Sequence, residues 1–185
     1  MSWLSWKKKS LDDVGEGADV RLVVFVASPD TLESALAPTR AAVFRWTLLT
    51  QHTGDGSYGA TSERLSVLAS GWRGGPLLVH ASCGRRIEVQ LDHAVLAAPV
   101  GPLDGTPIGS SPQSVQLYGA AAAASRSPVL VREHGLTHGQ PLTLVGHVVR
   151  VASSGGYREA GVAHDVAFRT EGAITLEDHT LDQGA

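Results

Sequence analysis

Short apolar runs separated by turn-forming residues dominate the chain. In RIEVQL, residues 86–91, the side chains of Ile87, Val89 and Leu91 fall on one face of an extended strand, while polar side chains fall on the other. Comparable runs lie near residues 19–27, 42–50, 62–69, 76–81, 128–133, 142–151 and 164–169, with a final short one at 173–177. Many short strands at this spacing are typical of a barrel or sandwich. The sequence therefore predicts an all-β protein, built as an OB-like, partly open β-barrel.

One segment departs from the strand pattern. Residues 112–126, PQSVQLYGAAAAASR, follow a serine with a proline and contain five consecutive alanines, the residue with the highest helix propensity. We expect one short helix here, interrupted or capped near Gly119; a loop is the alternative for its first half. Stretches rich in glycine, proline and serine around 51–61 and 99–112 predict long loops.

The 185 residues suffice for one domain with a substantial apolar core. Neither an internal repeat nor a second zone of composition interrupts the pattern. We therefore expect a single barrel-like domain over residues 19–178, preceded by a peptide and linker at 1–18 and followed by an acidic tail at 179–185.

Composition narrows the classes of function. Only 18% of residues are charged and the net charge is -3, so the chain lacks the basic field that nucleic-acid binding requires, and no nucleic-acid partner is expected. A single cysteine allows neither an internal disulfide nor a multi-cysteine zinc site, which fits a reducing compartment such as the cytoplasm. Apolar runs fall short of the roughly 20 residues that cross a bilayer, and no signal-peptide pattern is present. The expected location is cytoplasmic, with peripheral membrane contact left open.

The N-terminus has the most biased composition in the chain. All three lysines and two of the four tryptophans fall within its first nine residues. Indole rings beside a cationic run suit a groove on a partner protein or an acidic membrane surface, and a solvated tail is the alternative. The candidate docking residues are Trp3, Leu4, Trp6, Lys7, Lys8 and Lys9.

Cys83 is the one candidate nucleophile of the thiol type. It lies near His80, and cations at Arg85 and Arg86 could lower the pKa of its thiol. The surrounding stretch ASCGRR reads instead as a hairpin turn, in which Cys83 is a bystander. The two arginines are also candidates for contact with a ligand or an anion, or are simply solvated.

Histidines offer little support for a metal site. His134 and His138 have the spacing of a helical metal pair, and Glu133 could complete a three-ligand set, but Gly135 and Gly139 favour a loop. Asp92 and His93 are adjacent, so in a strand they would point to opposite faces. No cofactor and no metal are expected, and the chain is not expected to be an enzyme.

Three segments resemble one family. SALAPTRAAVFRW, LLVHASCGRRIEVQL and VREHGLTHGQPLTLVGHVV, within residues 30–178, are similar in order and spacing to the GIDE or beside-a-membrane (BAM) domain. That family is known from mitochondrial and chloroplast ubiquitin ligases and from membrane-associated bacterial proteins. This chain lacks the family's transmembrane helices and RING domain, and one cysteine cannot build a RING.

The resemblance implies roles for four residues in the third segment. Glu133 would end one strand, and Leu136 would fill the core. Gly139 would form the turn, and Gly146 would permit a bend or bulge in the following strand.

These observations lead to one expected function and two alternatives. We expect a noncatalytic binding or assembly module, docked to a protein partner or a membrane surface through its N-terminal peptide, with recognition by the loops near 51–61 and 99–112. The first alternative is a structural subunit of a larger assembly or a homo-oligomer, marked by an apolar patch or an open strand edge. The second is a small thiol-dependent enzyme using Cys83 and His80.

Overall fold

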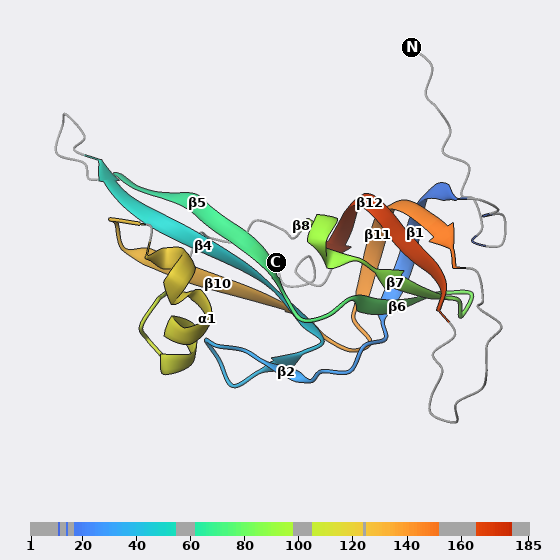
Figure 1. Cartoon of the computed structure of the whole chain (residues 1–185), viewed down its shortest axis with the longest axis horizontal. Helices are drawn as coiled ribbons and strands as arrows, with labels where there is room; N and C mark the ends of the chain where they lie inside the picture. Colours follow the sequence, from blue (N-terminus) through green and yellow to red (C-terminus); the bar gives the residue numbers. More distant parts are fainter. Residues whose placement is uncertain are drawn as a thin grey trace, which may run out of the picture. The chain divides into compact units, whose positions relative to one another are not determined.

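The chain folds as strands with one short helix, which confirms the predicted all-β class. The computed structural model describes residues 11, 14, 17–54, 62–97, 105–123, 125–151 and 166–178 (Figure 1). Contacts divide it into two compact units. The barrel unit comprises Met1–Ser28, Gly75–Pro99 and His138–Ala185, and the sheet unit comprises Pro29–Gly74 and Val100–Thr137.

Five strands of the barrel unit form a closed ring. Its order is β11 (Pro141–Arg150), β1 (Ala18–Val26), β6 (Leu77–Ala81), β7 (Arg86–Val89) and β12 (Val166–Asp178), and pairing of β12 with β11 closes it. Within the ring only β7 and β12 run parallel. A short 3-10 helix, η2 (Leu91–His93), leads into β8 (Ala94–Ala97), which adds to β12. The predicted β-barrel is thereby confirmed, as a closed five-stranded mixed barrel.

Alternation along the strands fills the barrel. In β6 the buried residues are Leu77, Val79 and Ala81, and in β7 they are Ile87 and Val89, each the inward half of an alternating pattern. These apolar side chains exclude water from the interior, which is the main source of the barrel's stability.

Gly146 marks a bulge in β11. The pairing of β11 with β12 shifts between Gly146 and His147, and Gly146 has a φ of 153°. A Cβ there would lie 2.5 Å from Cγ2 of Ile174, so only glycine fits without displacement of the neighbouring strand.

A four-stranded antiparallel sheet forms the frame of the sheet unit. Its order is β5 (Ser62–Arg73), β4 (Val43–Gly54), β10 (Val129–Leu136) and β9 (Thr106–Pro107). A separate hairpin pairs β2 (Leu32–Glu33) with β3 (Arg40–Ala41). One face of the sheet packs in a core cluster of Ala35, Leu48, Tyr118 and Val131.

The predicted helix exists as α1 (Pro112–Ala122), which Figure 1 shows beside β10. Ser111 caps it by accepting a hydrogen bond from the Ser114 amide, and Pro112 occupies the first turn, where no amide donor is needed. Gly119 lies inside the helix and neither interrupts nor caps it. The alternative of a loop in the first half is wrong.

Residues 19–178, predicted as one domain, span both compact units, and the sheet unit consists of two excursions from the barrel's chain. Two further expectations differ from the structure. The runs at 164–169 and 173–177 contribute to one strand, β12. Glu133 does not end its strand: β10 continues through Gly135 to Leu136, which is fully buried.

The N-terminal residues 1–9, the tail 179–185 and much of the two predicted recognition loops lie outside the described residues. Among the residues that are described, no helix has the length and apolarity needed to span a bilayer.

Candidate functional site

A buried carboxylate, that of Glu133, joins four parts of the sheet unit. Its side chain is only 2% exposed. Oε2 accepts hydrogen bonds from the hydroxyl of Ser34 (2.6 Å) and the amide of Ala35 (2.9 Å). Oε1 accepts from Nη2 of Arg73 (3.0 Å) and from the hydroxyl of Tyr118. Two donors therefore converge on each oxygen, which satisfies the usual capacity of a buried carboxylate.

Arg73, at the end of β5, supplies the counter-charge. Its side chain is 18% exposed, and Nη2 also donates to the carbonyl of Glu33 (2.7 Å). The guanidinium lies 4.7 Å from the centre of the Phe44 ring, a cation–π contact. The attraction between the two charges, together with their hydrogen bonds, offsets much of the free energy that is needed to remove two ions from water.

Tyr118 is a donor to this carboxylate. Burial raises the pKa of its phenol, and the hydrogen bond to Glu133 and that residue's negative charge raise it further, whereas Arg73 lowers it. The phenol is therefore protonated across the physiological range and keeps its proton directed at Glu133.

The segment 34–39, here named the pinned loop, is fixed by this carboxylate. Ser34 donates to Glu133, and its oxygen accepts from the amides of Leu36 (3.0 Å) and Ala37 (3.1 Å). The helix-capping hydroxyl of Ser111 donates to the carbonyl of Ala35 (2.9 Å). The loop is thus tied both to β10 and to the start of α1.

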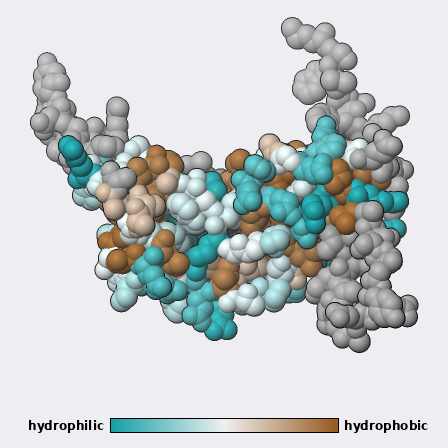
Figure 2. All heavy atoms as spheres, viewed as in Figure 1, coloured by the Kyte–Doolittle hydropathy of each residue, from teal (hydrophilic) through white to brown (hydrophobic). Residues whose placement is uncertain are grey.

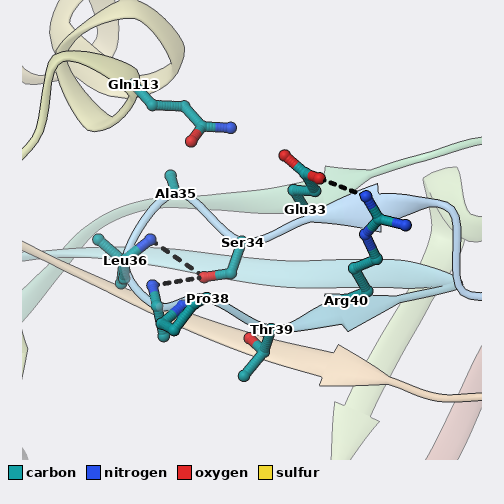
Figure 3. A pocket seen from close by; sticks show the side chains of 9 residues that line it. Glu33, Ser34, Ala35, Leu36, Pro38, Thr39, Arg40 and Gln113 are labelled. Carbon is teal, nitrogen blue, oxygen red and sulfur yellow. Dashed lines mark hydrogen bonds and ion pairs between the residues drawn. The ribbon is translucent and has the colours of Figure 1, made fainter.

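The pinned loop, β2, β3 and the start of α1 surround a pocket of about 480 Å³ (Figure 3). An exposed ion pair at its rim joins Arg40 to Glu33 (2.6 Å), across the β2–β3 hairpin. The pocket is lined by residues 33–40 and Gln113. Its wall combines four apolar side chains with two hydroxyl groups, one acid, one base and one amide.

The hydrogen bonds of Ser34 leave its hydroxyl poorly placed to act as a nucleophile. Ser34 is 8% exposed, its hydroxyl donates to Glu133, and its oxygen accepts from two backbone amides. An activated nucleophile needs a free base and access to substrate. The network therefore ties the pinned loop to β10 and to the start of α1 through hydrogen bonds.

Cys83 and His80 lie in the barrel unit. Cys83 is exposed in the turn between β6 and β7, as the hairpin interpretation predicted. His80 stacks on Phe25, with ring centres 5.4 Å apart, and no hydrogen bond joins it to Cys83. The structure does not assemble the pair into a thiol–imidazole dyad.

Arg85 and Arg86 belong to the same hairpin. Arg85 is exposed and its carbonyl accepts from the amide of Ala81 (2.9 Å), which closes the turn. Arg86 begins β7, opposite His80.

The histidines near Glu133 are separated by the strand geometry. His134 is in β10, not in a loop, and as Glu133's neighbour it points to the opposite face of the sheet. His138 follows the strand, with Nδ1 3.3 Å from the carbonyl of Ser28. Asp92 and His93 lie in a 3-10 turn, not in a strand. No cluster of three metal-binding side chains occurs among the described residues.

Sequence reasoning singled out Glu133 but missed Ser34, Arg73 and Tyr118. Their separations from Glu133 along the chain are 99, 60 and 15 residues, so no local spacing connects them. The candidate docking residues at 1–9 lie outside the described part of the chain. The chain matches no family model, and comparisons with curated proteins and with solved structures gave no significant match.

Proposed function

We propose that the protein is a noncatalytic binding module that uses the pinned loop as its recognition element. The observation that supports this function is the saturated carboxylate of Glu133, which ties the loop to the sheet without leaving a reactive group. A loop held in one conformation loses less entropy on binding, which favours affinity.

The pocket is suited to a small segment of a partner protein. Its volume, about 480 Å³, falls within the range common for ligand sites. Leu36 and Pro38 offer apolar contact, while Glu33 and Arg40 offer one charge of each sign at the rim. A short segment with an apolar side chain and a polar or zwitterionic neighbour fits this wall best.

The N-terminal peptide would provide a second attachment. Trp3 and Trp6 beside three lysines suit a groove on the same partner or an acidic membrane surface. Two linked contacts raise the local concentration at each site, so weak individual contacts can together give stable docking.

The test is retention of a partner by the full chain, tagged at its C-terminus and purified from its own cells. Ala37→Arg fills the pocket from an exposed position, and Ala120→Arg makes the same change on the exposed side of α1. We expect the first variant to lose the partner and the second to retain it. Equal retention by both would contradict recognition at the pocket.

Two further variants separate the alternatives. Deletion of residues 1–9 should reduce recovery with the partner or with membranes if the terminus docks; unchanged recovery would identify a solubilising tail. Cys83→Ala should leave retention unaltered, because Cys83 is exposed in a turn of the barrel unit. A loss caused by Cys83→Ala would favour the thiol enzyme.

A structural subunit is the second candidate function, and β5 favours it. In the part of the chain that is described, β5 is the end strand of its sheet. Val67 is 65% exposed and Leu68 38% exposed on it. Exposed apolar residues on an edge strand promote pairing between chains. Under this candidate, size-exclusion chromatography shows an oligomer that Val67→Lys dissociates; a monomer at all concentrations would exclude a homo-oligomer.

A further inference from the structure

The two charged side chains at the rim of the pocket keep unused hydrogen-bonding groups. Nη2 of Arg40 donates to Oε1 of Glu33 (2.6 Å), and the two side chains are 66% and 61% exposed. Among the residues that the structure describes, neither side chain forms another hydrogen bond or ion pair. A guanidinium has five N–H groups, and a carboxylate has two oxygens. Oε2 of Glu33 can therefore accept a further bond, and Arg40 can donate others.

Gln113 adds a third unused polar group to the pocket. Figure 3 shows it reaching from α1 toward the pinned loop. The residue is exposed, and within the described ranges no hydrogen bond reaches its side-chain amide. A carboxamide both donates and accepts, so it can bind the C=O and the N–H of a peptide backbone. Leu36 and Pro38 line the same pocket and offer apolar contact.

The β2–β3 hairpin fixes the order of the two rim charges. Glu33 and Arg40 lie directly opposite each other on the two strands, and the Cβ atoms of such cross-strand neighbours are about 5 Å apart. Alternate residues of an extended peptide point to the same side and are about 6.7 Å apart. Long side chains can span this small difference. A peptide that crosses the hairpin can therefore place one residue beside each charge.

We propose that the Glu33–Arg40 pair selects a partner segment in which a cation and an anion stand two positions apart in one order, next to an apolar residue. The cation binds Oε2 of Glu33, and the anion binds the unused N–H groups of Arg40. The apolar residue enters the pocket and fixes the direction of the segment, so the opposite charge order would bring like charges together. Repulsion of this kind gives specificity at charged rims. The inference rests on the proposed binding role of the pocket and adds the sequence pattern of its ligand.

Two fluorescein-labelled peptides of equal composition test the charge order by fluorescence anisotropy with the full chain. Their sequences are Lys-Ser-Glu-Ser-Leu and Glu-Ser-Lys-Ser-Leu, each with blocked ends. The double variant Glu33→Arg, Arg40→Glu exchanges the two rim charges and keeps a cross-strand ion pair. We expect the wild type to bind one peptide about fivefold or more tightly than the other, and the double variant to show the opposite preference.

Two further variants control for effects outside the rim charges. Arg21→Glu with Glu177→Arg makes the same exchange at an exposed ion pair of the barrel unit, where the charged groups are also 2.6 Å apart, and should keep the wild-type preference. Gln113→Ala removes a contact to the backbone that the two peptides share. It should weaken both peptides by the same factor and leave the preference unchanged.

Three outcomes would overturn the inference: equal affinity of the wild type for the two peptides, an unchanged preference in the double variant, or binding of neither peptide. Ala37→Arg, which fills the pocket, separates this failure from failure of the proposed function. If the wild type binds both peptides equally and Ala37→Arg abolishes binding, the pocket still binds a partner segment and only the charge selection is wrong. If Ala37→Arg binds both peptides as the wild type does, the peptides bind elsewhere and both proposals are wrong.

A second variant keeps the test valid if the double variant does not fold in a thermal melt. Arg40→Gln changes one exposed side chain and removes the positive charge of the rim. It should reduce the preference between the two peptides to about twofold or less. A preference that stays at the wild-type value would overturn the inference.

Discussion

Glu133→Gln tests the role of the buried carboxylate with almost no change in shape. Each carboxylate oxygen accepts from one hydroxyl and one N–H donor: Ser34 and the Ala35 amide on Oε2, Tyr118 and Arg73 on Oε1. Hydroxyl groups can rotate to accept a bond, but N–H groups cannot. Whichever way the new amide is oriented, its NH₂ group therefore faces either the Ala35 amide or Arg73.

The magnitude follows from these contacts. One buried donor left unsatisfied costs about 1–3 kcal/mol. The substitution also removes the negative charge opposite Arg73, whose side chain is 18% exposed. Loss of one partner of a buried ion pair typically destabilises by about 3–5 kcal/mol in total. We expect the free energy of unfolding of the sheet unit to fall by this amount, a large fraction of a typical domain's stability of about 5–15 kcal/mol.

Hydrogen exchange of the amides in β4 and β10 is the appropriate assay, because it reports the opening free energy of this sheet alone. Glu33→Gln is the matched control: Glu33 forms an exposed ion pair with Arg40, so its loss should cost at most about 1 kcal/mol. If the opening free energies of these amides in Glu133→Gln lie within about 1 kcal/mol of the wild-type values, the network does not stabilise the sheet.

The remaining predictions concern the phenol and the bulge. Tyr118→Phe should lower stability at neutral pH by about 1.5–3 kcal/mol, since it removes a bond to a charged acceptor. The pKa of Tyr118 is raised in the folded state, so its contribution to stability is complete below the unfolded pKa of about 10 and declines above it. The urea midpoints of the wild type and the variant should therefore converge at alkaline pH. A difference that stays constant with pH would refute this. Gly146→Ala should destabilise the barrel by about 1–3 kcal/mol, because its φ is positive and its Cβ would meet Ile174. Gly75→Ala, where no atom lies within 4 Å, should be nearly neutral in the same urea titration, and equal effects of the two changes would contradict the steric argument.

The alternation of apolar and polar residues predicted most strands, because a strand that is buried on one face needs an apolar side chain at every second position. The run RIEVQL became β7 with Ile87 and Val89 buried, although Leu91 is buried in a 3-10 turn rather than in the strand. The boundaries between the two units left no comparable pattern in the sequence. Both excursions that form the sheet unit consist of the same short strands and turns as the barrel, so composition does not change at the boundaries.

The site was harder to predict than the fold. Ser34 and Arg73 are ordinary loop and strand-end residues in the sequence, and they acquire their role only when β10 brings Glu133 beside them. Arg45 and His134 likewise lie opposite each other only through strand register. Pairing of distant strands therefore determines both sets of contacts, and no local pattern encodes it.

The two excursions also set the order in which the chain can fold during synthesis. The barrel ring closes only when β12 (Val166–Asp178) pairs with β11, so it requires nearly the last residue of the described chain. The sheet unit is complete at Thr137, some forty residues earlier by the unit boundaries. β1 pairs with both β6 and β11, so its pairing with β11 can form only after the whole sheet unit has been synthesised.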